Sequence, residues 1–125
     1  MKSKRAVLFS AVTGMLLAFS AEAQNTDSIR AAAERGDPTA QTTLGALYRH
    51  GMGVPQSDQE ATHWYLKAAN QGDAGAQTIV GMMYMQGQGV EKDEVQAKSW
   101  LRKAAAQGDT TAQRQLEFLK KPVKE

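Results

Sequence analysis

The stretch that decides the fold is residues 36–71, GDPTAQTTLGALYRHGMGVPQSDQEATHWYLKAANQ. Residues 72–107, GDAGAQTIVGMMYMQGQGVEKDEVQAKSWLRKAAAQ, repeat it without a gap, and 16 of the 36 aligned positions are identical. The Gly-Asp pair returns once more at residues 108–109, and the Ala-Gln pair returns at 112–113. Identity at a fixed spacing indicates a chain of stacked structural repeats, in which each repeat buries its apolar face against its neighbours.

Each repeat is expected to begin with a helix. Gly36 suits the left-handed residue that follows a preceding helix, Asp37 can cap the next one, and Pro38 fits a first helical position. Apolar residues then recur at the three- and four-residue spacing of one helix face. They are Ala40, Leu44, Leu47 and Tyr48 in the first repeat and Ala76, Val80, Met83 and Tyr84 in the second.

A second helix is expected after a glycine-rich turn in each repeat. Ser57 and Asp93 stand at equivalent positions and can cap this helix. Its apolar stripe consists of Ala61, Trp64, Tyr65 and Ala68 in the first repeat and Ala97, Trp100, Leu101 and Ala104 in the second. Because Trp64 and Trp100 lie in the middle of these stripes, both are predicted to be buried between helices.

A glycine recurs in the middle of the first helix of each repeat, and a lysine recurs near the end of the second helix. Gly45 and Gly81 stand in mid-helix, where a glycine costs about 1 kcal/mol relative to alanine. Their recurrence predicts a close approach of the partner helix, with a tryptophan over the glycine. Lys67 and Lys103 recur near the end of the second helix, where positive charge favours the helix dipole. We interpret these lysines as part of a solvated face.

Half repeats are expected at the two ends of an all-α array whose full repeats are 36–71 and 72–107. Residues 24–35 are predicted to form an N-terminal capping helix, equivalent to the second helix of a preceding repeat. Residues 108–125 are predicted to be a partial third repeat, with a C-terminal capping helix and a tail. There Glu117 replaces the mid-helix glycine and Lys120 replaces the tyrosine. A polar last helix keeps the end of a solenoid soluble.

Residues 1–23 are predicted to be a removable signal peptide. Three basic residues within the first five positions precede an apolar run at 6–19, and Ala21-Glu22-Ala23 is a small-x-small cleavage site. A membrane anchor is the alternative, but the run is shorter than the roughly 20 apolar residues that span a bilayer. We therefore expect cleavage after Ala23, no stable membrane insertion afterwards, and a periplasmic or secreted protein.

Charge and cysteine content narrow the classes of function. The full chain has 15 basic and 13 acidic residues, and residues 1–23 hold three of the basic and one of the acidic ones. The remaining chain therefore carries 12 of each, so the pI near 9.0 gives no case for nucleic-acid binding. With no cysteine, an exported chain must rely on packing rather than disulfides. We expect a monomer.

The repeated residues resemble the Sel1-like repeat, a relative of the tetratricopeptide repeat. The resemblance covers 33–69, with Ser57 where the family pattern has Asp, and 69–105, with Val80 where it has Leu. A partial match runs over 105–116. The resemblance implies an α-solenoid of antiparallel helix pairs stacked into a right-handed superhelix. It also implies a protein-interaction module with no chemistry of its own.

The expected function is therefore binding of another protein or peptide in the cell envelope, as an adaptor or regulator. The alternative is an envelope hydrolase that acts on cell-wall material. His50 and His63 lie on different segments. The equivalent residues of the second repeat are Gln86 and Ser99, so neither histidine recurs. No Gly-rich phosphate loop is present. We therefore predict no catalytic residue, no cofactor and no metal site.

The candidate partner-binding residues lie on the first helix of each repeat, on the stripe away from the predicted core. They are Thr43, Ala46 and Arg49 in the first repeat and Ile79, Met82 and Met85 in the second. The second stripe is more apolar than a solvent-facing surface needs to be, and methionine adapts to varied partners. The resemblance places these helices on the concave side of the array. The alternative is that Ile79 and Met82 pack against the neighbouring Ala46 or Phe118.

Overall fold

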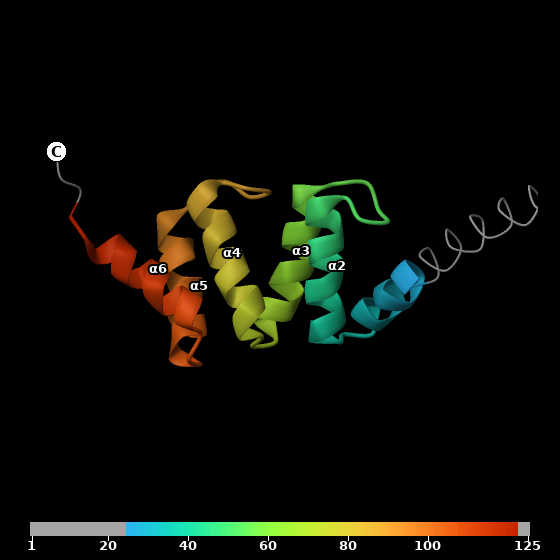
Figure 1. Ribbon diagram of the computed structural model, residues 1–125, viewed down its shortest axis with the longest axis horizontal. Coiled ribbons are helices and arrows are strands. Elements are labelled where there is room, and N and C mark those ends of the chain that lie inside the picture. The colour runs from blue at the N-terminus through green and yellow to red at the C-terminus, as the bar shows by residue number, and fades with distance from the viewer. Residues whose placement is uncertain (1–24, 123–125) are drawn as a thin grey trace, which may run out of the picture.

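The structure is a computed structural model that describes residues 25–122, and these residues form helices and short connections without a strand. A helical segment over 25–34 is followed by five helices. These are α2 (Pro38–His50), α3 (Asp58–Asn70), α4 (Ala74–Gln86), α5 (Glu94–Ala106) and α6 (Thr110–Lys120). Figure 1 shows them side by side in chain order. The all-α solenoid is confirmed, whereas the predicted signal peptide lies outside the described residues.

The helices pack on their neighbours in the chain, which is the pattern of a linear array. The pairs α2–α3 and α4–α5 are the two helix pairs predicted from the repeat, and α3–α4 and α5–α6 join one pair to the next. In the described part of the chain, no helix is both long and apolar enough to cross a membrane.

The helix ends follow the predicted capping chemistry. The Asp37 carboxylate accepts hydrogen bonds from the backbone N–H groups of Thr39 and Ala40, at 2.9 and 3.2 Å. Equivalent caps begin the other helices, with Ser57, Asp73, Asp93 and Asp109. Gly51 ends α2 in the left-handed conformation with φ of 65°, which only glycine adopts without strain.

The core is divided into three clusters, and two of them are related by the repeat. Ala33, Leu44 and Trp64 form the first cluster, from the 25–34 segment, α2 and α3. The second cluster is larger and contains the equivalent residues from one repeat later. Its buried members are Ala61, Tyr65, Ala68, Ala69, Ala76, Val80 and Met83, with Trp100 at its edge. The third consists of Leu101, Ala104 and Ala112.

The two tryptophans differ in burial, which corrects one expectation. Trp64 is 7% exposed and buried as predicted, but Trp100 is only partly buried. Part of the cover over Trp64 comes from His63, whose ring meets the indole edge-on at 5.3 Å between centroids. Ser99 stands at the equivalent position beside Trp100 and is too small to provide this cover.

The mid-helix glycines mark close helix contacts, but the residue over them is not the predicted tryptophan. A Cβ atom at Gly45 would lie 2.9 Å from the Tyr65 ring, and a Cβ at Gly81 would lie 2.8 Å from Leu101 Cγ. Tyr65 and Leu101 directly follow Trp64 and Trp100 in sequence. A 100° turn per residue separates neighbours on a helix, so the tyrosine and leucine face the first helix of their own pair while the tryptophans face the preceding repeat.

Candidate functional site

A ladder of glutamine side chains sets the position of each first helix. The Gln41 side-chain amide donates to the Ala33 carbonyl at 3.0 Å, and Gln71 donates to the Gln41 side-chain oxygen at 2.7 Å. One repeat later, Gln77 donates to the Ala69 carbonyl at 3.1 Å and receives a bond from Gln107 at 2.9 Å. Gln41 and Gln77 are buried, so these bonds join a helix firmly to the repeat before it.

The glycine-rich turns supply a second contact between repeats. Gly89, with φ of 73°, comes so close to the first turn of α3 that a Cβ there would collide with Asp58 and Thr62. Gly53 has the same φ, and its Cβ would meet the Thr26 hydroxyl at 2.8 Å. Thr26 lies in the 25–34 segment and Thr62 lies in α3, one period later. Each turn therefore contacts an equivalent threonine on the second helix of the repeat before it.

On α2, the structure places the three candidate residues in different surroundings. Thr43 is exposed, and its hydroxyl donates to the Thr39 carbonyl at 2.9 Å. Ala46 is half-buried against the second cluster. Arg49 is half-buried, and its charge acts on the Tyr65 hydroxyl. Of these three, Thr43 is the one whose side chain is open to a partner.

On α4, the three apolar candidates are all half-buried, but not against the same neighbours. Ile79 packs on the second cluster, and Met85 packs on the third cluster. Met82 is half-buried and belongs to none of the three clusters. Packing therefore accounts for Ile79 and Met85 in part and leaves Met82 as the least explained methionine. Partner binding by these residues stays a prediction.

Tyr65 is a titratable residue that the fold perturbs. Burial raises the pKa of its hydroxyl above the usual value of 10.0, and the Arg49 charge and hydrogen bond lower it by a smaller amount. The hydroxyl is therefore neutral at physiological pH. Its place under Gly45, inside a helix pair, makes it a packing residue rather than a surface acid.

Two recurring features of the second helices form one arrangement, and both lysines are exposed, as interpreted from the sequence. The Lys67 ammonium lies 4.7 Å from the centroid of the Trp64 ring, and the Lys103 ammonium lies 4.4 Å from that of Trp100. At these distances a cation is attracted to the face of the indole. The lysines therefore face solvent and at the same time contact the tryptophan rings.

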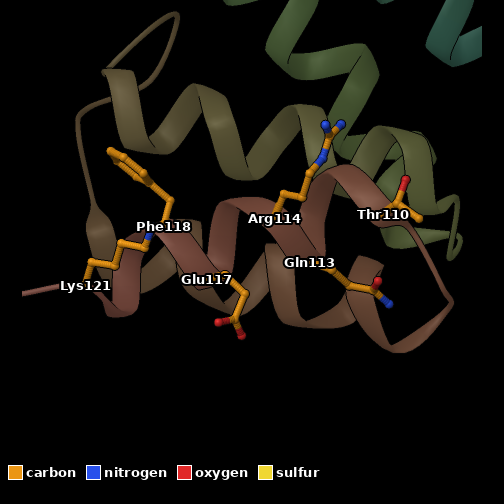
Figure 2. A pocket seen from close by; sticks show the side chains of 6 residues that line it. All are labelled: Thr110, Gln113, Arg114, Glu117, Phe118 and Lys121. Atoms are coloured by element: carbon orange, nitrogen blue, oxygen red, sulfur yellow. The ribbon is translucent and has the colours of Figure 1, made fainter.

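An exposed depression on α6 was not predicted from the sequence. Figure 2 shows it, with a volume of about 410 Å³, and its six lining residues all come from the last helix and its cap. They are Thr110, Gln113, Arg114, Glu117, Phe118 and Lys121. Phe118, one of the two packing partners in the alternative for Ile79 and Met82, is 69% exposed, whereas the other, Ala46, packs on the second cluster as Ile79 does.

Metal-binding side chains are spread apart over residues 25–122. Over that range, no three His, Cys, Asp or Glu side chains gather so that they could hold a metal ion. His50 and His63 are both exposed, and the His63 ring contacts Trp64. The arrangement of these residues offers surfaces for contact rather than a set of convergent acids and bases.

The fold and its surfaces define a helical repeat protein. The family model of the Sel1 repeat matches residues 38–73 and 74–109, which together make up more than half of the chain. The chain belongs to the Sel1 repeat family. Sel1 repeats generally serve as non-catalytic scaffolds for protein–protein interaction. Neither the family match nor the structural neighbours support the hydrolase alternative.

Solved structures of Sel1-type proteins are similar to this chain. A protective antigen of uropathogenic Escherichia coli with an SLR fold is 38% identical, with a TM-score of 0.76 over 78% of this chain and 21% of that one. A Sel1 repeat protein from Oxalobacter formigenes is 42% identical, with a TM-score of 0.76 over 78% and 28%. Helicobacter pylori cysteine rich protein B is 29% identical, with a TM-score of 0.67 over 70% and 65%.

The chain thus spans between a fifth and two thirds of the length of these structures. No curated protein matches it.

Proposed function

We propose that this chain is an exported adaptor or regulator that binds a protein or peptide in the cell envelope. The proposed contact surface is the first-helix face, which we define as the exposed side of α2 and α4 around Thr43, Ala46, Ile79 and Met82. We infer the location of the protein, in the periplasm or outside the cell, from the leader-like residues 1–23. The interaction role is that of the Sel1 repeat family in general.

The observation that carries the proposal is the composition of α4. Its sequence AGAQTIVGMMYMQ contains no charged residue, although Ile79, Met82 and Met85 all keep some exposure. At the positions equivalent to Ile79 and Met82, α2 has Thr43 and Ala46, so stability of the repeat does not demand large apolar side chains there. A flexible thioether at Met82 suits an interface with a partner.

Site-specific photo-crosslinking tests this proposal. A photoreactive residue at Thr43, which is exposed on the first-helix face, should give a discrete adduct in cells. The matched control is Gln59, which is also exposed but lies at the start of α3. The proposal predicts an adduct from position 43 and none of the same mass from position 59. Identical adducts from both positions, or none from either, would contradict it.

The export part of the proposal has a separate test. Intact-mass measurement of the protein from the envelope fraction should give a chain that starts at Gln24, because Ala21-Glu22-Ala23 fits a signal-peptidase site. A mass that still contains residues 1–23, or recovery of the protein only from the cytoplasm, would rule out cleavage after Ala23.

A further inference from the structure

A groove between α5 and α6 combines two leucines with three cations, and its volume is about 290 Å³. Leu116 and Leu119 of α6 form its apolar part, and both are half-buried against the third cluster. Lys98 and Arg102 of α5 and Lys120 of α6 line the rest. None of the five lining residues is acidic. The groove therefore offers apolar contact directly beside positive charge.

The positive charge of this groove is not a rule of the repeat. One repeat earlier, the positions of the three cations hold Thr62, Leu66 and Tyr84, none of which is basic. The positions of the two leucines hold Val80 and Met83, which are buried. Both copies thus share the apolar positions, whereas the three cations occur together only in the last copy. Folding of the repeat does not demand them.

Arg102 and Lys120 stand where a cation and an aromatic ring meet elsewhere in the array. Two repeats earlier their equivalents are Arg30 and Tyr48, and the Arg30 guanidinium lies 5.8 Å from the centroid of the Tyr48 ring. A lysine in place of this ring puts a second positive charge beside the arginine. Neighbouring like charges repel each other, and an anion bound between them replaces this repulsion by attraction.

The ion pairs within the chain leave much of this charge available. Lys98 and Lys120 each contact a glutamate of their own helix, Glu94 and Glu117, at 3.0 Å. The two glutamate side chains are 62% and 71% exposed, and ion pairs in such positions contribute little. Arg102 is exposed and has no ion pair within residues 25–122. Its planar guanidinium can bind a carboxylate through two parallel hydrogen bonds.

We propose that this groove binds a peptide segment of a partner protein in which an acidic residue stands next to a large apolar one. The carboxylate lies between Arg102 and Lys120, and the apolar side chain rests on Leu116 and Leu119. Pockets that enclose a whole small molecule usually measure about 300–1,000 Å³. A groove of about 290 Å³ between two helices suits single side chains of a peptide better.

This second contact surface does not depend on the first-helix face, because its residues lie on α5 and α6. Phage-displayed random peptides test it on the purified chain, expressed with its own leader. The library is depleted on the Arg102→Glu variant and then selected on the parent. The recovered peptides should carry aspartate or glutamate next to leucine, isoleucine or phenylalanine. Recovered peptides without acidic residues, or no peptide that distinguishes the two proteins, would overturn the proposal.

Fluorescence anisotropy with one recovered peptide measures the contribution of the groove. Arg102→Glu should weaken binding by about tenfold or more, which corresponds to about 1.4 kcal/mol. Arg114→Glu is the matched control, because it makes the same change of charge at an exposed arginine outside the groove, and it should leave binding unchanged. Thermal unfolding checks that both variants fold. Equal losses in the two folded variants, or no loss in either, would contradict the assignment.

Changes in the peptide separate the two halves of the proposed contact. Exchange of its acidic residue for the corresponding amide, or of its apolar residue for serine, should each weaken binding to the parent. A peptide that binds as well with serine would show attraction by charge alone and would contradict the proposal. Phosphatidylglycerol vesicles are the second probe, and the parent should not cosediment with them. Binding to the vesicles that is lost in Arg102→Glu would make a membrane the occupant and would likewise overturn the proposal.

Discussion

Gly81 illustrates how a single residue can set the spacing of two helices. The site is buried, and a Cβ there would lie 2.8 Å from Leu101 Cγ and 3.1 Å from the Ala97 carbonyl oxygen. Leu101 is itself fully buried, so it has little room to move away. The Ala97 carbonyl belongs to the helix backbone, so it can move even less. The glycine is therefore required by packing, in spite of its low helix propensity.

We expect Gly81→Ala to lower the free energy of unfolding by about 1–3 kcal/mol, the usual cost of overpacking a core. Gly75→Ala, on the exposed side of the same helix, is the matched control, since its Cβ would meet only the Asp73 side chain at 3.3 Å. That variant should be neutral or gain up to about 1 kcal/mol from helix propensity. Urea unfolding measures both, and a stabilised Gly81→Ala variant would refute the close contact.

Tyr65 should make stability depend on alkaline pH. Its folded pKa is raised above 10.0, so the folded state holds the phenolic proton more tightly than the unfolded chain does. This stability is fully present below pH 10 and is lost as the pH rises through the folded pKa. Unfolding free energies of the parent should fall more steeply above pH 10 than those of Tyr65→Phe. Parallel pH profiles would show that the hydroxyl is not held in this way.

At the scale of helices, the sequence predicted what depends on local chemistry. Asp37 begins α2 and Gly51 ends it through contacts with residues nearby in the chain, so these two residues are enough to place the helix. The glutamine ladder could not be predicted in the same way. Gln71 and Gln41 are 30 residues apart in the chain, and only the packing of α2 and α3 brings them within 2.7 Å. The recurrence of Gln41 as Gln77 and of Gln71 as Gln107 is a signal in the sequence, but it does not reveal that the two side chains meet.

The glutamine bonds should contribute more to the free energy of unfolding at Gln77, inside the array, than at Gln113, at its end. In Gln77→Ala, the Ala69 carbonyl and the Gln107 amide both lose their partner near a buried site, and leaving buried polar groups unpaired costs about 1–3 kcal/mol. Gln113→Ala removes one exposed bond to the Ala105 carbonyl and should cost about 1 kcal/mol or less. Equal losses in urea unfolding would show that burial of the ladder does not matter.

The tryptophans allow a similar comparison between the two repeats. Trp64 is buried in the first cluster, so Trp64→Ala should cost about 3–5 kcal/mol, as is usual for a large core side chain. Trp100 is partly exposed at the edge of the second cluster. Trp100→Ala should therefore lower the free energy of unfolding by clearly less than Trp64→Ala does. Chemical unfolding of both variants gives the two values, and an equal or reversed order would contradict the difference in burial.

At the scale of the whole molecule, the repeat made the array predictable but not its surfaces. A repeated pattern reports the positions that all copies share, and these are the caps, the glycines and the core. A surface that binds depends on positions where the copies differ, such as Met82 and its equivalents Ala46 and Phe118. The sequence could name these residues. It could not show that Met85 packs on the third cluster while Phe118 is left exposed, because neighbouring helices decide that.

The central claim is that this array binds a partner through the first-helix face, and Met82 is the residue on which to test it. Met82→Gln keeps the helix propensity of the site, and it avoids the core contacts that Met85 makes. The matched control is Met52→Gln, at a methionine that is 59% exposed in the turn between α2 and α3.

The measurement is the affinity of the folded parent and of both variants for the protein recovered by crosslinking at position 43. We predict that Met82→Gln weakens binding by more than tenfold, which is about 1.4 kcal/mol or more, and that Met52→Gln leaves it unchanged. Unchanged binding by a folded Met82→Gln variant would contradict the claim.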